Sequence, residues 1–231
     1  METDRIINEY VARDKAGRFS YYSMLQSVNQ FNAHSFERAL FSVFSKAKYD
    51  NLAGKKFVDI GCGTGGLLLR WIQWGALPEN CHGIELVPHR LEQARHRLAP
   101  AVHLHNVDAS RLPYPDATFD VASQMTVLSS ILDKSMQMAV ASEMFRVTKR
   151  DGLILSYDFW LNPTNPATRG VRLATLRRLF PNCKLYSQRI TLAPPITRCL
   201  IKVSPLLCRG LERLKLFNSH YLVMIKPDPK P

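Results

Sequence analysis

The stretch FVDIGCGTGG, residues 57–66, decides the fold class of this chain. Residues 57–60 form a short apolar run with one acid, as in a buried β-strand, and four glycines follow within the next six positions. Apolar residues then recur at helical spacing from Leu67 to Ile72. Glycine lets the backbone turn sharply and approach a ligand that a Cβ atom would block. The stretch therefore predicts a strand, a tight turn beside a ligand, and a helix.

Strands and helices alternate along the rest of the chain. A lead-in helix is expected at residues 34–47, and further helices at residues 88–98, 134–147 and 171–180. Further strands are expected at residues 81–86, 102–107, 119–125, 153–157 (after a turn at Asp151-Gly152), 184–191 and 220–225. This alternation predicts an α/β fold with a Rossmann-like, doubly wound, mainly parallel sheet, in which ligands bind at the carboxyl ends of the strands.

Length and charge predict one domain with three parts. The chain has 231 residues, of which 46% are hydrophobic, and these values fit a single packed domain, residues 1–231. Residues 1–160 carry 18 Lys and Arg against 17 Asp and Glu, whereas residues 161–231 carry 13 against 2. We expect residues 1–50 to form an N-terminal lid, residues 51–160 the cofactor-binding core, and residues 161–231 a basic part with a cover for the acceptor and the closing strands.

Several protein classes are disfavoured by what the sequence lacks. No apolar run reaches the length of a membrane span, and the charged start does not resemble a signal peptide, so we expect a cytoplasmic protein. The five cysteines show no paired spacing, which predicts reduced thiols, no disulfide framework and no metal site.

Acidic residues follow three neighbouring strands of the predicted sheet. The glycine turn fits both dinucleotide and other nucleoside cofactors, but Asp59 would repel a diphosphate and attract a cationic ligand. Glu85 is placed to accept two ribose hydroxyls, and Asp108 to accept an adenine amino group while the N–H of Ala109 reaches a ring nitrogen. The alternative for each acid is a surface loop or a helix cap. Together they favour a cationic nucleoside cofactor.

On these residues the chain resembles the class I S-adenosylmethionine-dependent methyltransferases, in particular the methyltransferase type 11 group. The resemblance spans residues 57–157 and rests on the motifs at residues 58–65, 83–85, 108–109, 112–116 followed by 119–120, and 143–147. It implies S-adenosylmethionine as the cofactor, a seven-stranded sheet with an antiparallel last strand, and a position for Gln124 facing the methionine end of the cofactor. Arg150-Asp151-Gly152 departs from the Pro-Gly-Gly that is usual in the family. The expected cofactor-binding residues are Asp59, Gly61, Cys62, Gly63, Gly65, Glu85, Leu86, Asp108, Ala109 and Gln124.

The run from Tyr157 to Trp160 is placed where the fifth strand ends in the pocket. We expect Asp158 to act as a base or to orient the substrate, with Tyr157 and Trp160 shaping the acceptor site. His34 and His220 are further catalytic candidates because either lies on an element that reaches the pocket in this fold. The alternative is that Asp158 caps a turn, that Trp160 belongs to the core and that the histidines are structural.

The expected reaction is O-methylation of a hydroxyl on a sugar-like or natural-product acceptor, a small molecule or a glycan, and the basic charge also suits an anionic one. Alternatives are an RNA methyltransferase that uses the basic third, an NAD(P)-dependent reductase, and a non-catalytic cofactor-binding module. Residues 194–217 interleave leucines with arginines and lysines, and Pro205 interrupts any long helix there. This stretch suits a cover over the acceptor pocket, while docking on an anionic membrane stays open. Few aromatic residues are available for base stacking, which disfavours nucleic acid.

Overall fold

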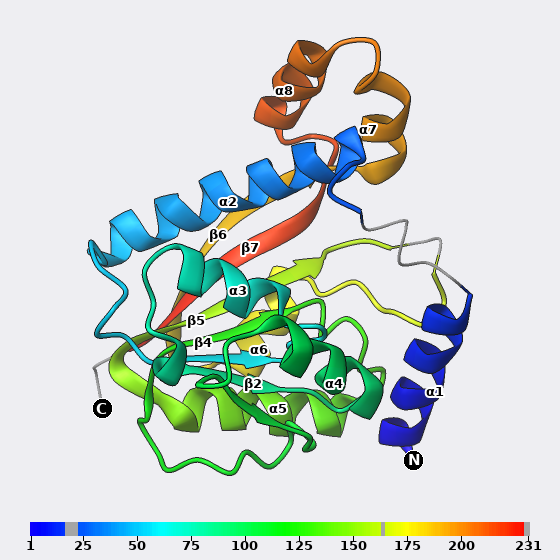
Figure 1. The fold of residues 1–231 in the computed structure, drawn as a ribbon. Helices are drawn as coiled ribbons and strands as arrows, with labels where there is room; N and C mark the ends of the chain where they lie inside the picture. The colour runs from blue at the N-terminus through cyan, green and yellow to red at the C-terminus, as the bar shows by residue number, and fades with distance from the viewer. Residues whose placement is uncertain (17–22, 163–164, 229–231) are drawn as a thin grey trace.

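A computed structural model describes residues 1–16, 23–162 and 165–228, and its centre is a seven-stranded sheet in the order β3-β2-β1-β4-β5-β7-β6 (Figure 1). The strands are β1 (Phe57–Ile60), β2 (Cys81–Ile84), β3 (His103–His105), β4 (Phe119–Met125), β5 (Thr148–Phe159), β6 (Cys183–Leu192) and β7 (Asn218–Pro227). β1 to β5 are parallel, and β7 runs antiparallel to both β5 and β6. The predicted mainly parallel sheet with an antiparallel last strand is therefore confirmed.

Helices cover both faces of the sheet (Figure 1). The described helices are α1 (Glu2–Lys15), α2 (Ser27–Ala47), α3 (Gly66–Gln73), α4 (Pro88–Arg97), α5 (Lys134–Val147), α6 (Leu173–Leu179), α7 (Pro194–Leu200) and α8 (Pro205–Leu214), with a short 3-10 turn at Pro78–Asn80. Successive residues of a strand face opposite sides, so Phe57 packs with α2 and α3 while Val58 packs with α5 and α6. Burial on both faces explains the consecutive apolar residues at Val121–Ala122 of β4 and Leu153–Leu155 of β5.

The predicted turn at Asp151-Gly152 is wrong, because β5 runs without a break from Thr148. Phe119 pairs with Thr148 but Val121 already pairs with Leu153, so β5 accommodates its extra residues as an irregularity within the strand. A Cβ atom at Gly152 would lie 2.8 Å from the carbonyl oxygen of Asp120, which accounts for a glycine at this close approach. Most other elements begin or end within a few residues of their expected limits, but α2 starts seven residues earlier than expected, at Ser27.

The helices α7 and α8 project from the body of the molecule beyond the start of α2 (Figure 1). Pro205 is the first residue of α8, where its missing N–H costs no hydrogen bond, and the Ser204 side chain accepts from the N–H of Leu207. Among the described residues there is no helix with the length and apolar character needed to cross a membrane.

Candidate cofactor and acceptor site

The glycine turn after β1 has a left-handed backbone at Gly61, Gly63 and Gly65, with φ of +66°, +56° and +79°. A Cβ atom at Gly61 would lie 2.4 Å from a methyl carbon of Val127, and one at Gly65 would lie 2.6 Å from a methyl carbon of Leu98. At Gly63 a Cβ atom would meet nothing within 4 Å. The outer two glycines are therefore required by packing, whereas Gly63 leaves open space in front of its backbone for a ligand.

Glu85, directly after β2, ties this turn to the neighbouring strand. Its carboxylate accepts from the N–H of Gly63 and from the N–H of Val87, each at 2.8 Å, and the residue is 6% exposed. Burial raises the pKa of Glu85, and the two N–H donors act in the opposite direction. Each carboxylate oxygen retains a further acceptor site, so Glu85 can still receive a pair of hydroxyl groups.

Asp59 is buried in β1, two residues before the turn. Its carboxylate accepts from the Ser123 hydroxyl of β4 at 2.8 Å. Burial raises its pKa to about 7, and the charge of Glu85 adds to this rise. Because an ionised carboxylate in such a site is costly without a positive partner, a cation bound at the turn would stabilise it. The open space at Gly63 and the acids beside it therefore fit a cationic nucleoside cofactor.

The other expected cofactor residues lie along the same edge of the sheet. Cys62 is buried, its N–H donates to the carbonyl of Ile84 at 2.9 Å, and burial raises the pKa of its thiol, so it contributes its backbone to the turn. Leu86 and Ala109 are partly buried against the core below this edge. Asp108 accepts from the N–H of Ser110 at 2.8 Å, so it does cap its own loop, as the alternative interpretation expected.

A buried polar network joins the ends of β4 and β5. The Gln124 amide donates to Asp158 at 2.5 Å and to the hydroxyl of Ser156 at 2.6 Å, while its oxygen accepts from the N–H of Val127. The other oxygen of Asp158 accepts from the N–H of Ser129 at 3.0 Å. Asp158 is 2% exposed, and burial raises its pKa to about 6. The network fixes the loop that follows β4, and the sequence offered no signal for its serines.

Tyr157 lies on the opposite face of β5 from Asp158. Its hydroxyl is 2.8 Å from that of Thr191, its ring stacks on His220 at 4.6 Å between centroids, and Phe36 of α2 meets it edge-on. Burial raises the pKa of Tyr157 and lowers that of His220 to about 3. Tyr157 and His220 therefore form an uncharged aromatic stack that is separate from the polar network around Asp158.

The structure does not bring the expected catalytic side chains together. His34 is exposed on α2, on the side away from the buried residues of that helix. Trp160 is partly buried, with its indole N–H donating to the carbonyl of Asn218 at 2.7 Å and the guanidinium of Arg189 over its ring. Of the residues expected around the acceptor, Asp158 alone shares a network with an expected cofactor residue, Gln124.

The helix α1 lies beside the edge where the parallel strands end (Figure 1). Its Tyr10 hydroxyl lies 2.9 Å from that of Ser130, in the loop after β4. At its other end Asp14 pairs with Arg90 at 2.7 Å and with His89 at 2.7 Å, both in the first turn of α4. The helix thus connects the loop after β4 with the segment that follows Glu85.

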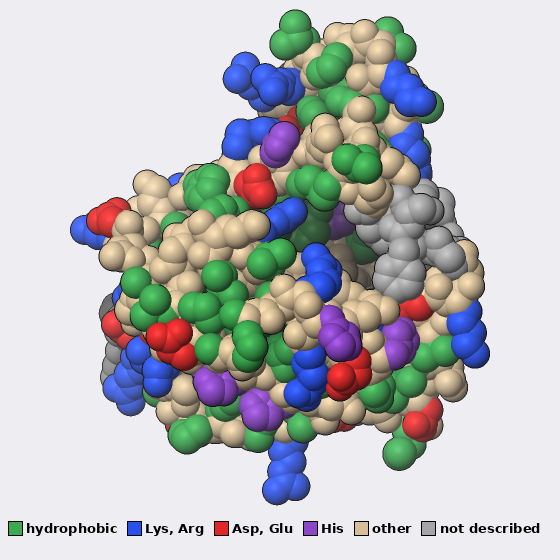
Figure 2. All heavy atoms as spheres, in the orientation of Figure 1, with side chains coloured by type: hydrophobic (Ala, Val, Ile, Leu, Met, Phe, Trp, Pro, Cys, Tyr) green, Lys and Arg blue, Asp and Glu red, His purple; other side chains and the backbone are tan. Residues whose placement is uncertain are grey.

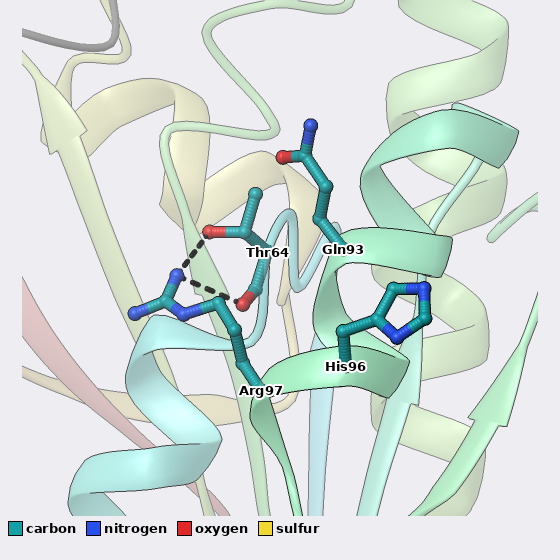
Figure 3. Close-up of a pocket in the computed structure, with 4 residues that line it drawn as sticks. All are labelled: Thr64, Gln93, His96 and Arg97. Carbon is teal, nitrogen blue, oxygen red and sulfur yellow. Dashed lines mark hydrogen bonds between the residues drawn. The ribbon is translucent and has the colours of Figure 1, made fainter.

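The described residues form several concave regions. A cavity of about 450 Å³, lined by Thr64, Gln93, His96 and Arg97, lies on the outer side of the glycine turn, and Arg97 donates there to both oxygens of Thr64 (Figure 3). A second cavity of about 220 Å³ lies between α2, β6 and α8. The surface is also hollowed at the end of β5, below α7 (Figure 2). Asp158 belongs to the last residues of β5, the strand at whose end this hollow lies.

Comparisons with known proteins agree with this geometry. Residues 57–152 match the family model described as a methyltransferase domain. The solved structure of magnesium protoporphyrin IX methyltransferase from Synechocystis PCC 6803 with bound SAH has a TM-score of 0.66 and 14% identity, covering 98% of this chain and 100% of that one. Residues 57–152 form a class I methyltransferase domain. The expected family is thereby confirmed, and with it S-adenosylmethionine as the cofactor of the domain.

Curated relatives differ in what their names describe. The 27-O-demethylrifamycin SV methyltransferase of Amycolatopsis mediterranei is 32% identical, with the match covering 48% of this chain and 41% of the relative. A demethylmenaquinone methyltransferase of Alkalihalophilus pseudofirmus is 26% identical, with 71% and 67% covered. The chain spans 30% to 43% of the length of four of the relatives that it matches. These relatives support the methyltransferase domain and differ in acceptor.

Proposed function

We propose that this protein transfers the methyl group of S-adenosylmethionine to a hydroxyl group of a small acceptor, sugar-like or natural-product in character. One observation carries the donor half: within a methyltransferase domain, buried Glu85 accepts from the N–H of Gly63 beside open space, and buried Asp59 lies near enough for the charge of Glu85 to raise its pKa. A diphosphate cofactor would place its negative charge beside these two acids, and the sulfonium and ammonium groups of S-adenosylmethionine would place positive charge there.

Each residue of this edge is assigned one part of the donor. Glu85 accepts the two ribose hydroxyls, because its carboxylate is held in place by two N–H donors. Asp108 accepts the adenine amino group, with Leu86 and Ala109 beside the ring. Asp59 stabilises the cationic end, and Gln124 faces the methionine end. We also assign α1 as a lid, since Asp14 and Tyr10 connect it to the two sides of the edge.

When bound, S-adenosylmethionine would supply a methyl group on a positively charged sulfur. The acceptor oxygen would form a bond to that methyl carbon as the carbon–sulfur bond breaks, S-adenosylhomocysteine would leave with the electron pair, and the hydroxyl proton would pass to a base. Holding the reactants in line contributes roughly 7 to 11 kcal/mol to such a displacement, against roughly 3 to 5 kcal/mol from a general base. The polar network around Asp158 holds the ends of β4 and β5 in one arrangement, which is what alignment requires.

Asp158 is proposed as the group that orients the acceptor and receives its proton. Its pKa of about 6 means that the carboxylate is ionised at neutral pH and is a stronger base than an ordinary aspartate. Its two oxygens already accept from Gln124 and from Ser129, and each oxygen retains a further acceptor site for the hydroxyl of a bound acceptor. Tyr157 and Trp160 are proposed to shape the hollow at the end of β5, and exposed His34 is left as a weaker candidate.

The 27-O-demethylrifamycin relative supports a hydroxyl on a natural product as the acceptor class, since its name describes methylation at oxygen. The inner side of α7, above the hollow at the end of β5, is proposed to cover the bound acceptor (Figure 2). No observation on the described residues favours RNA over a small acceptor, and an RNA substrate is therefore an outcome for experiment to exclude.

The test is a screen of hydroxylated acceptors with the whole chain, following release of S-adenosylhomocysteine. The panel contains sugars, sugar nucleotides, glycolipid headgroups, phenolic and macrolide natural products, amines and an unmodified RNA. We expect turnover with at least one hydroxyl acceptor, and the product mass should rise by one methyl group at oxygen. Turnover confined to the amines or the RNA would contradict the proposed acceptor, and absence of donor binding would contradict the donor site.

A further inference from the structure

The outer side of the α7–α8 projection exposes an unusual amount of apolar surface. We define the α7–α8 surface by its apolar members Val203, Leu206, Leu207, Leu214, Leu216 and Phe217, of which Val203 is 79% exposed and Leu206 76%. Exposed cations lie among them, namely Lys202, Arg209, Arg213 and Lys215. Single exposed leucines are common on soluble proteins, but several close together mark an interaction site.

The order of residues around α8 separates three kinds of side chain. Cys208, Leu211 and Glu212 lie on the side that faces the body of the molecule. At 3.6 residues per turn, Leu206, Leu207 and Leu214 fall on one adjoining arc and Arg209 and Arg213 on the other. An apolar arc beside a cationic arc is the arrangement of helices that lie in a membrane interface.

The exposed leucines are not needed to attach the projection. Phe31 of α2, Leu192 of β6, Ile201 and Cys208 form a separate buried cluster beneath α7 and α8. This cluster holds the inner side of both helices against the body, and the outer side faces solvent in the described part of the chain. The apolar arc therefore has a use other than packing within this molecule.

The charge of the surface is uncompensated toward solvent. Between residues 194 and 217 the sequence contains one acid, Glu212. Its side chain is 13% exposed and turns inward, where it accepts from the Ser35 hydroxyl and pairs with Arg38 of α2 at 3.1 Å. Figure 2 shows blue and green side chains, and little red, over the projection at the top of the molecule. A partner of this face must present negative charge together with apolar material.

We propose that the α7–α8 surface docks the protein on a lipid bilayer that contains anionic headgroups. Leucines enter the boundary between headgroups and acyl chains, while Arg209 and Arg213 reach the phosphates. A nucleic acid would supply the negative charge, but its bases would find only Phe217 as an aromatic partner among the members of this surface. The bilayer is the partner that uses both arcs.

The experiment is sedimentation of the full chain with vesicles of phosphatidylcholine alone or with phosphatidylglycerol added. We expect binding to the anionic vesicles and at least about tenfold weaker binding to the neutral ones, because each basic residue near an anionic surface changes partitioning by about fivefold. Replacing Leu206 and Leu214 together by Glu should lower the binding by about tenfold or more. Replacing Arg209 and Arg213 by Glu should do the same.

Matched variants separate docking from general effects of charge. Met138→Glu on α5, where Met138 is 63% exposed, and Arg95→Glu on α4 should bind vesicles like the wild type. Thermal unfolding shows whether each variant is folded, and an unfolded Leu206→Glu, Leu214→Glu protein is replaced by the Ala pair. The proposal is overturned by absence of vesicle binding, by loss only with the arginine variants, or by tighter binding to an RNA of equal charge concentration. Since neither donor nor acceptor is present, these results leave the proposed methyl transfer untouched.

Discussion

The ends of β1 and β2 differ from the end of β5 in how their acids are held. Glu85 is fixed by main-chain N–H groups, whose positions follow from the glycine turn and the strand register. Asp158 is fixed mainly by the side chain of Gln124 and by a loop N–H from Ser129. Gln124 and Ser129 lie within residues 57–152, which match the family model, whereas Asp158 lies just beyond them. The acid of the proposed donor side is thus held by backbone groups, and the acid of the proposed acceptor side mainly by a side chain.

The largest expected effect tests the acceptor side of this comparison. Asp158→Asn should lower turnover about 100-fold or more, since a general base contributes about 10² to 10⁴. Donor affinity should fall much less than turnover, because Asp158 does not contact the glycine turn and reaches the proposed donor site only through Gln124. In the wild type, turnover should fall as the pH drops through about 6, where Asp158 becomes protonated. If Asp158→Asn changes KM but leaves turnover and its pH profile as in the wild type, Asp158 has a structural role only.

The next effect tests the donor side. Glu85→Gln should weaken donor binding about 100-fold, because it removes the charge from hydrogen bonds that are each worth about 1.5 to 3 kcal/mol. Calorimetric titration measures the change. Glu92→Gln on α4 is the matched control, since that side chain is 63% exposed and pairs only with the neighbouring Arg95 among the described residues. Equal donor affinity in the two variants would contradict the placement of the ribose.

A smaller effect follows from the raised pKa of Asp59, about 7 in the folded protein. A cationic donor prefers the ionised carboxylate, so donor affinity should be full above this pKa and fall as the pH drops through it. The decrease should approach about tenfold per pH unit below the pKa. Titrations from about pH 8 to about pH 6 measure it. Asp59→Asn should bind more weakly and lose this pH dependence, and an unchanged slope in that variant would exclude Asp59 as its source.

The smallest effect concerns α1 as a lid. Asp14→Asn should weaken donor binding only about fivefold, because the pair with Arg90 is partly exposed and such pairs are worth about 1 kcal/mol. Amide hydrogen exchange of residues 2–15 should increase in this variant and decrease when the donor binds. Asp4→Asn is the control, since Asp4 pairs only with the exposed terminal amine in the described structure. If the donor does not change the amide hydrogen exchange of residues 2–15, α1 is not a lid over the donor site.

The sequence predicted the donor side because each signal there is local. Glycines at fixed spacing mark the turn, and an acid at the end of a strand must lie at the common edge of a parallel sheet. Asp59 lies in β1 and Glu85 directly follows β2, as the pattern predicted, and their contact with the donor stays a prediction. The network of Ser129 and Ser156 with Asp158 joins residues about 30 positions apart, and no spacing rule predicts such a contact.

The sequence carried a signal for the exposed position of His34 but none for the continuous β5. Phe36 lies on the buried face of α2, and His34 is two positions earlier. At 3.6 residues per turn, two positions are more than half a turn, so His34 points away from that face. Its exposure therefore follows from the same periodicity that predicted the helix. The continuous β5 had no such signal, because Asp151-Gly152 is as typical of a turn as of an irregular strand.

The central claim is that this edge of the sheet selects a cationic adenosyl cofactor over a dinucleotide. The most direct measurement is calorimetry of the full chain with S-adenosylmethionine, S-adenosylhomocysteine and NAD+ in one buffer. The account predicts one site per chain for each of the first two ligands, weakened by Glu85→Gln, and no heat from NAD+. Binding of NAD+ with no binding of S-adenosylmethionine would contradict it.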